Sequence, residues 1–261
     1  MMRLHDHLVE ERDGAVGVLR IDREEALGAL SRSLVERLGE YLDQLHRDPE
    51  VRVLVLTGTG RGFVAGADIG EYDRVAPDAF DDYQRLSRRT FSALERLPQF
   101  TIAAVNGYAL GGGMELALCC DLILASERAK FGLPEVKLGL IPGGGGTQRL
   151  ARAAGTRFAK EATVTGRFYR PEELRRRGVV SDVCPPDELM PTVMELAQTI
   201  AANAPLAVRA AKRIVDLGAD VPLEVGLGLE QQALSELYRS RDGAEGIAAF
   251  IEKREPKFIG Q

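Results

Sequence analysis

Two glutamates, Glu115 and Glu135, stand beside glycine-rich segments and could carry acid–base chemistry. Glu115 lies between a glycine run and the apolar residues 116–120, where an ionised carboxylate is costly unless it has a partner or a task. Glu135 follows in the sequence Leu133-Pro134-Glu135. A lone glutamate is usually a solvated surface group, and the context of these two sets them apart. Together they could accept and deliver a proton at one reacting molecule.

Backbone amides near the same segments could stabilise negative charge. Residues 62–69 are mostly small, and small side chains let a ligand approach the main chain closely. Glycines 111–113 open an expected helix, where free N–H groups and the positive end of the helix dipole converge. A second glycine run, 143–146, precedes another helical pattern. Each run alone is more typical of a tight turn, so the interpretation depends on their combination.

Other kinds of catalysis lack the residues they need. The three histidines, His5, His7 and His46, lie far in sequence from the glycine-rich segments, which gives little support to a triad or a metal cluster. The sequence contains no GxSxG turn and no GxxxxGK(S/T) loop, and residues 58–62 lack the spacing of a dinucleotide-binding GxGxxG turn. We therefore predict neither a metal site nor a separately bound cofactor.

Composition is that of an ordinary globular protein, with 261 residues, 45% of them hydrophobic and 28% charged. The net charge of −5 argues against nucleic-acid binding but is compatible with a small polyanionic ligand, which needs only a few local cations or N–H groups. The three cysteines form no CxxC pair, which predicts buried reduced thiols. Residues 1–7 include charged side chains where a signal peptide would need an apolar stretch. No run approaches the roughly 18 apolar residues of a membrane span, so we expect a cytoplasmic protein that binds no membrane.

Hydrophobic patterning predicts a layered α/β core followed by helices. Apolar, β-branched runs that end in polar or glycine-rich turns predict strands at 15–21, 51–57, 101–105 and 122–125. Leu34, Leu38, Leu42 and Leu45 recur at helical spacing between the first two strands. Helical patterns without intervening strands cover 205–215, 223–238 and 242–253. We expect a core of residues 1–195 and a helical region of residues 196–261.

The last predicted helix carries an aromatic residue off its apolar stripe. Phe250 falls outside the stripe, and Lys253 lies one turn later on the same side. Packing against another helix or subunit and contact with a ligand's aromatic and phosphate groups both remain open for this pair. The predicted core stripe consists of Ala244, Ile247, Ala248 and Ile251.

Taken in order, these segments resemble the crotonase, or enoyl-CoA hydratase/isomerase, superfamily. The resemblance runs from residues 22–27 through the glycine-rich segments to residues 204–209 and 245–254, so it covers essentially the whole chain. It implies an α/β fold with a spiral core of repeated ββα units and a helical C-terminal trimerisation region. A homotrimer or homohexamer is the expected assembly.

The resemblance also implies roles for particular residues. Glu115 and Glu135 match the two glutamates of the family's hydratases, and the N–H groups of Ala67 and Gly112 match the pair that holds the thioester oxygen. Gly143 is similar to the glycine that helps to place the water. The positions that match the CoA or acyl site are Ala26, Leu27, Ala65, Asp68, Ile69, Phe250 and Lys253, the last two reaching the CoA of a neighbouring subunit.

The activity implied is that of an enoyl-CoA hydratase, which adds water to a trans-2-enoyl-CoA thioester and gives a 3-hydroxyacyl-CoA, as in the β-oxidation of fatty acids. Coenzyme A is then part of the substrate. The alternatives are double-bond isomerisation or another acyl-CoA reaction, and a CoA-thioester-binding protein with little activity. The chain departs from the family pattern at Gly70, where many hydratases have lysine, and at residues 22–24 and 27–29. Residues 71–83 correspond to the variable acyl-pocket region.

Overall fold

The computed structural model describes residues 2–261; Met1, the first residue of the charged N-terminal segment, lies outside them. The strands are β1 (Met2–His5), β2 (Leu8–Asp13), β3 (Val16–Ile21), β4 (Val53–Gly58), β5 (Gly62–Val64), β6 (Phe100–Val105), β7 (Tyr108–Leu110), β8 (Leu122–Ser126), β9 (Lys130–Gly132) and β10 (Asp182–Cys184). They form a seven-stranded sheet with the order β1-β2-β3-β4-β6-β8-β10 and a three-stranded sheet with the order β5-β7-β9.

Helices account for most of the remaining chain. The α-helices are α1 (Arg32–Leu45), α2 (Pro77–Glu95), α3 (Gly112–Ala117), α4 (Gly146–Ala154), α5 (Thr156–Thr165), α6 (Pro171–Arg175), α7 (Leu189–Ala202), α8 (Pro205–Ala219), α9 (Leu223–Tyr238) and α10 (Arg241–Glu252). The short 3₁₀ helices are η1 (Glu24–Ala26), η2 (Ile69–Tyr72) and η3 (Glu135–Leu138). Within residues 2–261, none of these helices is long and apolar enough to cross a membrane.

From β4 to β10, consecutive strands alternate between the two sheets. β4, β6 and β8 are neighbours in the large sheet, and the strands that follow each of them, β5, β7 and β9, are neighbours in the small one. All of these neighbours pair in parallel. Helices α2 and α3 follow the first two strand pairs. The predicted spiral of ββα units is confirmed, and the carboxyl ends of β5, β7 and β9 meet at one edge of the small sheet.

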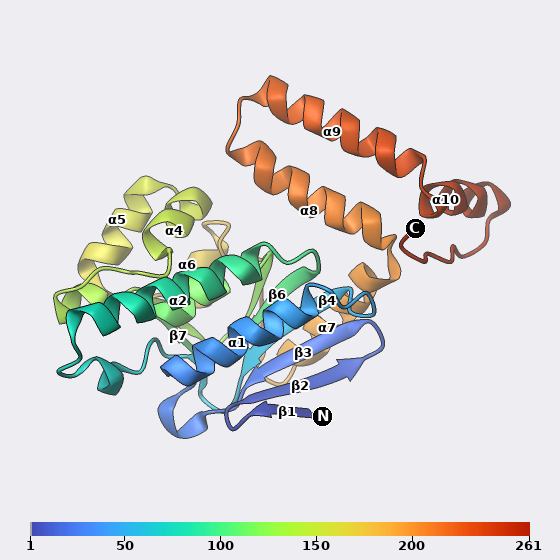
Figure 1. Ribbon diagram of the computed structural model, residues 1–261. Coiled ribbons are helices and arrows are strands. Elements are labelled where there is room, and N and C mark those ends of the chain that lie inside the picture. Colours follow the sequence, from blue (N-terminus) through green and yellow to red (C-terminus); the bar gives the residue numbers. More distant parts are fainter. Residues whose placement is uncertain (1) are drawn as a thin grey trace.

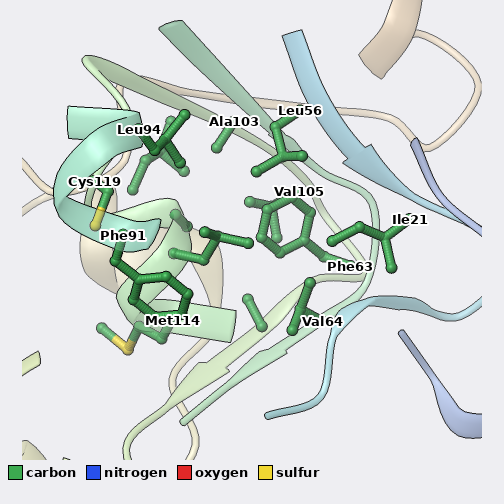
Figure 2. Packing of buried hydrophobic residues seen from close by; sticks show 14 of the residues in the cluster. Ile21, Leu56, Phe63, Val64, Phe91, Leu94, Ala103, Val105, Met114 and Cys119 are labelled. Carbon is green, nitrogen blue, oxygen red and sulfur yellow. The ribbon is translucent and has the colours of Figure 1, made fainter. Parts of the chain in front are cut away.

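The large sheet is covered by apolar side chains on both faces, as its β-branched strands predict. Val53 and Val55 of β4 belong to one buried cluster with residues of α7. Leu54 and Leu56 alternate to the opposite face and join the main core, which also contains residues of α1, α2 and the small sheet. Figure 2 shows part of this core, where Leu56 and Phe63 lie among side chains from both sheets. The site-bearing loops therefore stand on two rigid, packed layers.

The C-terminal helices are attached to this core at few points. Figure 1 shows α8, α9 and α10 extending away from the two sheets. Lys212 of α8 reaches back to the start of β6, where its Nζ lies 2.8 Å from a carboxylate oxygen of Asp121 and donates to the carbonyl of Gln99 at 3.1 Å. The Lys212 side chain is only 6% exposed. A buried ion pair thus fixes the angle at which α8 leaves the core.

The core stripe predicted for the last helix is wrong for this chain. Ile247 and Ile251 of α10 are 49% and 73% exposed, because α10 lies beyond α9 and does not reach the core. The buried residues of α10 are instead Asp242 and Ala249. The Asp242 carboxylate accepts the N–H groups of Ile259 and Gly260, each at 2.8 Å, so it holds the C-terminal segment against the helix.

The division of the chain into residues 1–195 and 196–261 stays a prediction. Position 195 lies inside α7, which runs without a break to Ala202 and packs on the large sheet. The end of α7 is therefore a more natural position for such a division. The strands and helices predicted on either side of it are present, with ends shifted by a few residues.

The buried ion pair between Lys212 of α8 and Asp121, the residue before β8, leads to a stability prediction. The substitution Lys212→Met removes one partner, and breaking a buried pair typically costs about 3 kcal/mol or more of unfolding free energy, since a charge is left buried. Asp121 keeps the hydrogen bonds from Thr101 N and Oγ1, so we expect a loss near this lower value. Urea unfolding followed by circular dichroism measures it.

A matched control is Lys160→Met, because Lys160 is exposed on α5. We expect the control to unfold at the wild-type urea concentration. Equal midpoints for the Lys212 variant and the control would show that the ion pair contributes nothing to attaching α8.

Candidate active site

Glu115 is a buried carboxylate held by main-chain amides. It lies in the first turn of α3 with a side chain 3% exposed, and its Oε1 accepts the N–H of Gly146 at 2.7 Å. Gly146 is the first residue of α4, so the carboxylate lies at a helix N-terminus, where free N–H groups and the helix dipole favour negative charge. The local fold therefore provides a partner for a charge that burial disfavours.

Opposing effects act on the acidity of Glu115. Burial raises the pKa of its carboxyl above the ordinary value. The amides of Gly146, Gly144 and Gly145 lower this pKa, and so does the positive charge of Arg149. Burial is the largest effect, and the amides offset part of it by stabilising the charged form.

Glu135 reaches the same place from the small sheet. It begins η3, a few residues after β9, and is half-buried. Burial raises the pKa of its carboxyl to about 7, and the charge of Glu115 contributes in the same direction. Its buried Oε2 has no hydrogen-bond partner among residues 2–261. Glu135 thus combines a pKa near neutral pH with one buried oxygen that accepts no hydrogen bond from the described residues.

The glycine turn before α3 lies against the carboxyl group of Glu135. A Cβ atom at Gly111 would lie 3.0 Å from Oε1 of Glu135, and Gly111 has a φ of +52°, which favours glycine. Gly111 immediately precedes α3, the helix that carries Glu115. The predicted pair is therefore brought together at the N-terminal end of α3.

The two predicted amide donors are neighbours as well. A Cβ atom at Gly112 would lie 3.8 Å from the amide nitrogen of Ala67. Leu30 pairs with this segment through Gly66 O at 2.8 Å and Asp68 N at 2.9 Å, which leaves the N–H of Ala67 outside the pairing. Gly112 begins α3, so its N–H has no acceptor within the helix. Two backbone donors thus lie together beside the acids.

The third glycine of the 111–113 run has a structural task. A Cβ atom at Gly113 would lie 1.8 Å from the carbonyl oxygen of Val64 in β5, so α3 packs directly on the backbone of the small sheet. At Gly112 the same atom would meet nothing closer than 3.8 Å. One glycine is required for packing, and the other leaves space next to the two amides.

The second glycine run contacts Glu115 through Gly146 and approaches it at Gly144, and the predicted water-positioning role of Gly143 stays a prediction. Gly143, the expected water-positioning residue, is exposed, and a Cβ atom there would lie 2.5 Å from Oε1 of Gln84. A Cβ atom at Gly144 would lie 2.7 Å from Oε2 of Glu115, and Gly146 donates to Oε1. Four consecutive glycines marked this loop in the sequence, but nothing in the sequence distinguishes its members.

The residues predicted to line a CoA or acyl site near the N-terminus lie together. Ala26 ends η1, and Leu27 follows it with a left-handed φ of 51°. The Leu27 carbonyl accepts the N–H of Ala65 at 3.0 Å, which joins this turn to the segment that carries Ala67. Main chain from two distant parts of the sequence thus forms one wall beside the amide pair.

Asp68 and Ile69 continue this wall. The Asp68 carboxylate accepts a hydrogen bond from Arg23 at 2.8 Å and caps η2 through the N–H of Gly70 at 3.1 Å. Ile69 is about half exposed. The Asp68 side chain therefore fixes the loop, and Arg23, which sequence reasoning did not single out, is the partner that ties this loop to η1.

Residues from η2 and α2 form a polar and aromatic cluster next to this segment. Tyr72 accepts a hydrogen bond from the Gln84 amide at 3.2 Å and packs edge-on against Phe80 and Tyr83. The charge of Glu115 contributes to a raised pKa of Tyr72, after the larger effect of burial. Tyr72 of the variable segment predicted to shape an acyl pocket therefore forms a polar pair near Glu115 with Gln84, the residue that follows this segment.

Phe250 and Lys253 are not brought to this site within the chain. Phe250 of α10 is 86% exposed, and Lys253 caps the same helix in a left-handed conformation. Figure 1 shows α10 beyond α8 and α9, away from the helices around the acids. Their predicted role at the site of a neighbouring subunit stays a prediction.

The arrangement combines proton transfer with stabilisation of an oxyanion. One carboxylate is held by amides, a second has a pKa of about 7, and a pair of N–H groups lies beside them. Such donors stabilise the negative charge that develops on a carbonyl oxygen during addition or enolisation. The site thus suits reactions next to a carbonyl group.

The chain is similar to known proteins over nearly its whole length. The family model described as enoyl-CoA hydratase/isomerase matches residues 11–261. The short-chain-enoyl-CoA hydratase of Clostridium acetobutylicum is 40% identical over 250 residues, covering 95% of this chain and 96% of that protein. The crotonyl-CoA hydratase of Syntrophomonas wolfei is 37% identical over 258 residues, covering 98% and 99% of the two chains.

Solved structures share the fold over the same length. The crystal structure of an enoyl-CoA hydratase from Bacillus anthracis matches with a TM-score of 0.96 at 40% identity, covering 98% of this chain and 100% of that one. The predicted fold class is therefore confirmed. Its two sheets, its C-terminal helices and its sequence similarity show that the chain belongs to the enoyl-CoA hydratase/isomerase, or crotonase, family.

Proposed function

We propose that the protein is an enoyl-CoA hydratase that adds water to a trans-2-enoyl-CoA thioester and gives a 3-hydroxyacyl-CoA. The observation that supports this most directly is the pairing of Glu115 and Glu135 around one end of α3, beside the amides of Ala67 and Gly112. Hydration needs two proton-transfer groups and a site for a developing oxyanion, and this arrangement supplies both.

The amide pair acts on the thioester carbonyl. When water adds to the β-carbon of the conjugated thioester, electrons move onto the carbonyl oxygen, which becomes enolate-like. The N–H groups of Ala67 and Gly112 donate to this oxygen. Because the donors are fixed in the backbone before the reaction, each is worth about 3 kcal/mol of transition-state stabilisation.

The two glutamates take different parts because their surroundings differ. Glu115 accepts a backbone hydrogen bond that favours its charged form, so it acts as the base and takes a proton from water as the oxygen bonds to the β-carbon. Glu135, with a pKa of about 7, holds a proton and delivers it to the α-carbon. Afterwards Glu115 is protonated and Glu135 is ionised, and proton exchange with solvent restores the pair.

We assign the remaining predicted residues to substrate binding. Ala26, Leu27, Ala65, Asp68 and Ile69 would contact the CoA or acyl part, and CoA enters as part of the substrate, with no separate cofactor. Exposed apolar side chains on the C-terminal helices, among them Val215, Leu223 and Ile251, support a homotrimer or homohexamer. In such an assembly Phe250 and Lys253 would reach the CoA bound to a neighbouring subunit.

Substitution of the acids tests the proposal directly. Glu115→Gln and Glu135→Gln should each lower the rate of hydration by at least about 100-fold, the usual size of a general acid–base effect. Loss of the ultraviolet absorbance of crotonyl-CoA measures hydration, and binding of a CoA thioester should change little. Undiminished turnover in either variant would refute the assignment, and isomerisation of a 3-enoyl-CoA without hydration would favour the isomerase alternative.

The space beside Gly112 gives a second test. In Gly112→Ala the new methyl group would lie 3.8 Å from Ala67 N, where it fits the fold but occupies the position of the thioester oxygen. We expect kcat to fall by about 100-fold, as when one oxyanion donor is lost, with an unchanged melting temperature. Gly228→Ala is the control, since a Cβ atom there meets nothing within 4 Å. Equal kcat values for the two variants would place the thioester elsewhere.

The acidity of Glu135 predicts a pH dependence. Its raised pKa means that the free enzyme keeps the required proton below about pH 7 and loses it above. The kcat/KM for hydration should therefore fall as pH rises through this value, by about tenfold for each further pH unit. Steady-state rates measured across neutral and alkaline pH give the apparent pKa of this decrease. Because Glu115 and Glu135 interact, this apparent pKa is a property of the two acids together. A constant kcat/KM throughout this range would contradict the acid role of Glu135.

A further inference from the structure

Arg149 lies behind the glycine loop that holds Glu115. Its Nη1 donates to the carbonyl of Gly144 at 2.7 Å, and its Nε and Nη2 donate to the two carboxylate oxygens of Glu95, each at 2.7 Å. The side chain is 17% exposed. A bidentate arginine–carboxylate pair fixes both position and angle, so the guanidinium is held firmly between α2 and α4.

The loop is shaped to receive this guanidinium. Gly145 has a φ of +106°, and a Cβ atom there would lie 2.0 Å from Nη1 of Arg149. Only glycine at this position lets Arg149 fold back over the loop. The next residue, Gly146, donates its N–H to Glu115. Fixing the carbonyl of Gly144 therefore fixes the amide that holds the carboxylate, two residues further along.

We propose that Arg149 is a positioning residue for Glu115: it clamps the 144–146 loop against Glu95 and so fixes the amides that orient the carboxylate. The inference deepens the proposed function, because it rests on Glu115 acting as the base. Arg149 acts through the backbone and not on the substrate. The chain of contacts runs from the end of α2 through Glu95, Arg149 and Gly144 to Gly146 and the acid on α3.

The charge of Arg149 adds to its geometric effect. Glu115 faces Glu135 from η3, Tyr72 from η2 and Cys119 from the turn after α3, and none of these carries positive charge. Arg149 from α4 supplies the positive charge that opposes the effect of burial on the pKa of Glu115. The carboxylate of Glu95 balances part of this charge and keeps the guanidinium buried.

Two substitutions separate geometry from charge. Arg149→Lys keeps the positive charge, but lysine cannot form a bidentate pair with Glu95 and also reach the carbonyl of Gly144. Arg149→Met removes both the charge and the hydrogen bonds. Glu95→Gln keeps Arg149 and weakens only its anchor. The matched control is Arg152→Met, one turn further along α4, where the side chain is exposed and contacts no residue of the loop.

Kinetics with crotonyl-CoA over a range of pH is the first measurement. Misplacing a catalytic group by about 1 Å can cost about 100-fold, so we expect kcat to fall by about 30-fold in Arg149→Met and Arg149→Lys. KM should stay within about threefold, because Arg149 does not contact the thioester in this mechanism. Glu95→Gln should show a smaller fall, and Arg152→Met none.

The acid limb of the pH profile distinguishes positioning from general loss of structure. Without the guanidinium, the pKa of Glu115 rises further, so the base becomes protonated at higher pH and the acid limb moves upward in Arg149→Met. In Arg149→Lys the limb should stay close to that of the wild type while kcat remains low. A purely structural defect would not separate the two variants in this way.

Hydrogen exchange gives a readout that does not depend on activity. Amide exchange of residues 143–147, followed by mass spectrometry, should be faster in both Arg149 variants and in Glu95→Gln than in Arg152→Met. Wild-type kcat and an unmoved acid limb in Arg149→Met, or unchanged loop exchange, would overturn the clamp. If the wild type hydrates no enoyl-CoA, the proposed function fails, and the exchange data still decide whether Arg149 holds the loop.

Discussion

The stability of one buried charge governs the architecture of this site. Glu115 is almost inaccessible to water. A carboxyl group there can ionise only if main-chain N–H groups replace the hydration that burial removes. Those groups come from the loop before α4, which is distant in sequence. The positions of α3, of the glycine loop and of Arg149 behind it are all constrained by this requirement.

The spiral of ββα units explains how distant segments meet these demands. Each site segment follows the carboxyl end of one strand of the small sheet: Ala67 comes after β5, Glu115 after β7 and Glu135 after β9. Parallel pairing of these strands places their ends side by side. Close contact between α3 and β5, possible only because residue 113 is glycine, then brings the amides next to the acids.

Much of the site was predictable because short sequence patterns mark it. The two acids and the two amides stand in segments whose order and glycine content are distinctive, and the strands that carry them have clear apolar patterns. Partners from distant segments, such as Glu95 for Arg149, leave no local signal. The core stripe expected on α10 was wrong because a helical pattern shows which side is apolar but not what covers it.

The unequal surroundings of the two acids follow from this architecture. Glu115 faces the N-terminus of α4, where its Oε1 accepts a fixed main-chain donor. Glu135 begins a short 3₁₀ helix, and its buried Oε2 has no hydrogen-bond partner among residues 2–261. Fixed donors stabilise the ionised form, and a buried oxygen without them favours the protonated form. Because the negative charge of Glu115 also raises the pKa of Glu135, the ionisation of one acid helps to keep the proton on the other. In the proposed mechanism, a pair built in this way carries its proton on Glu135 and its negative charge on Glu115.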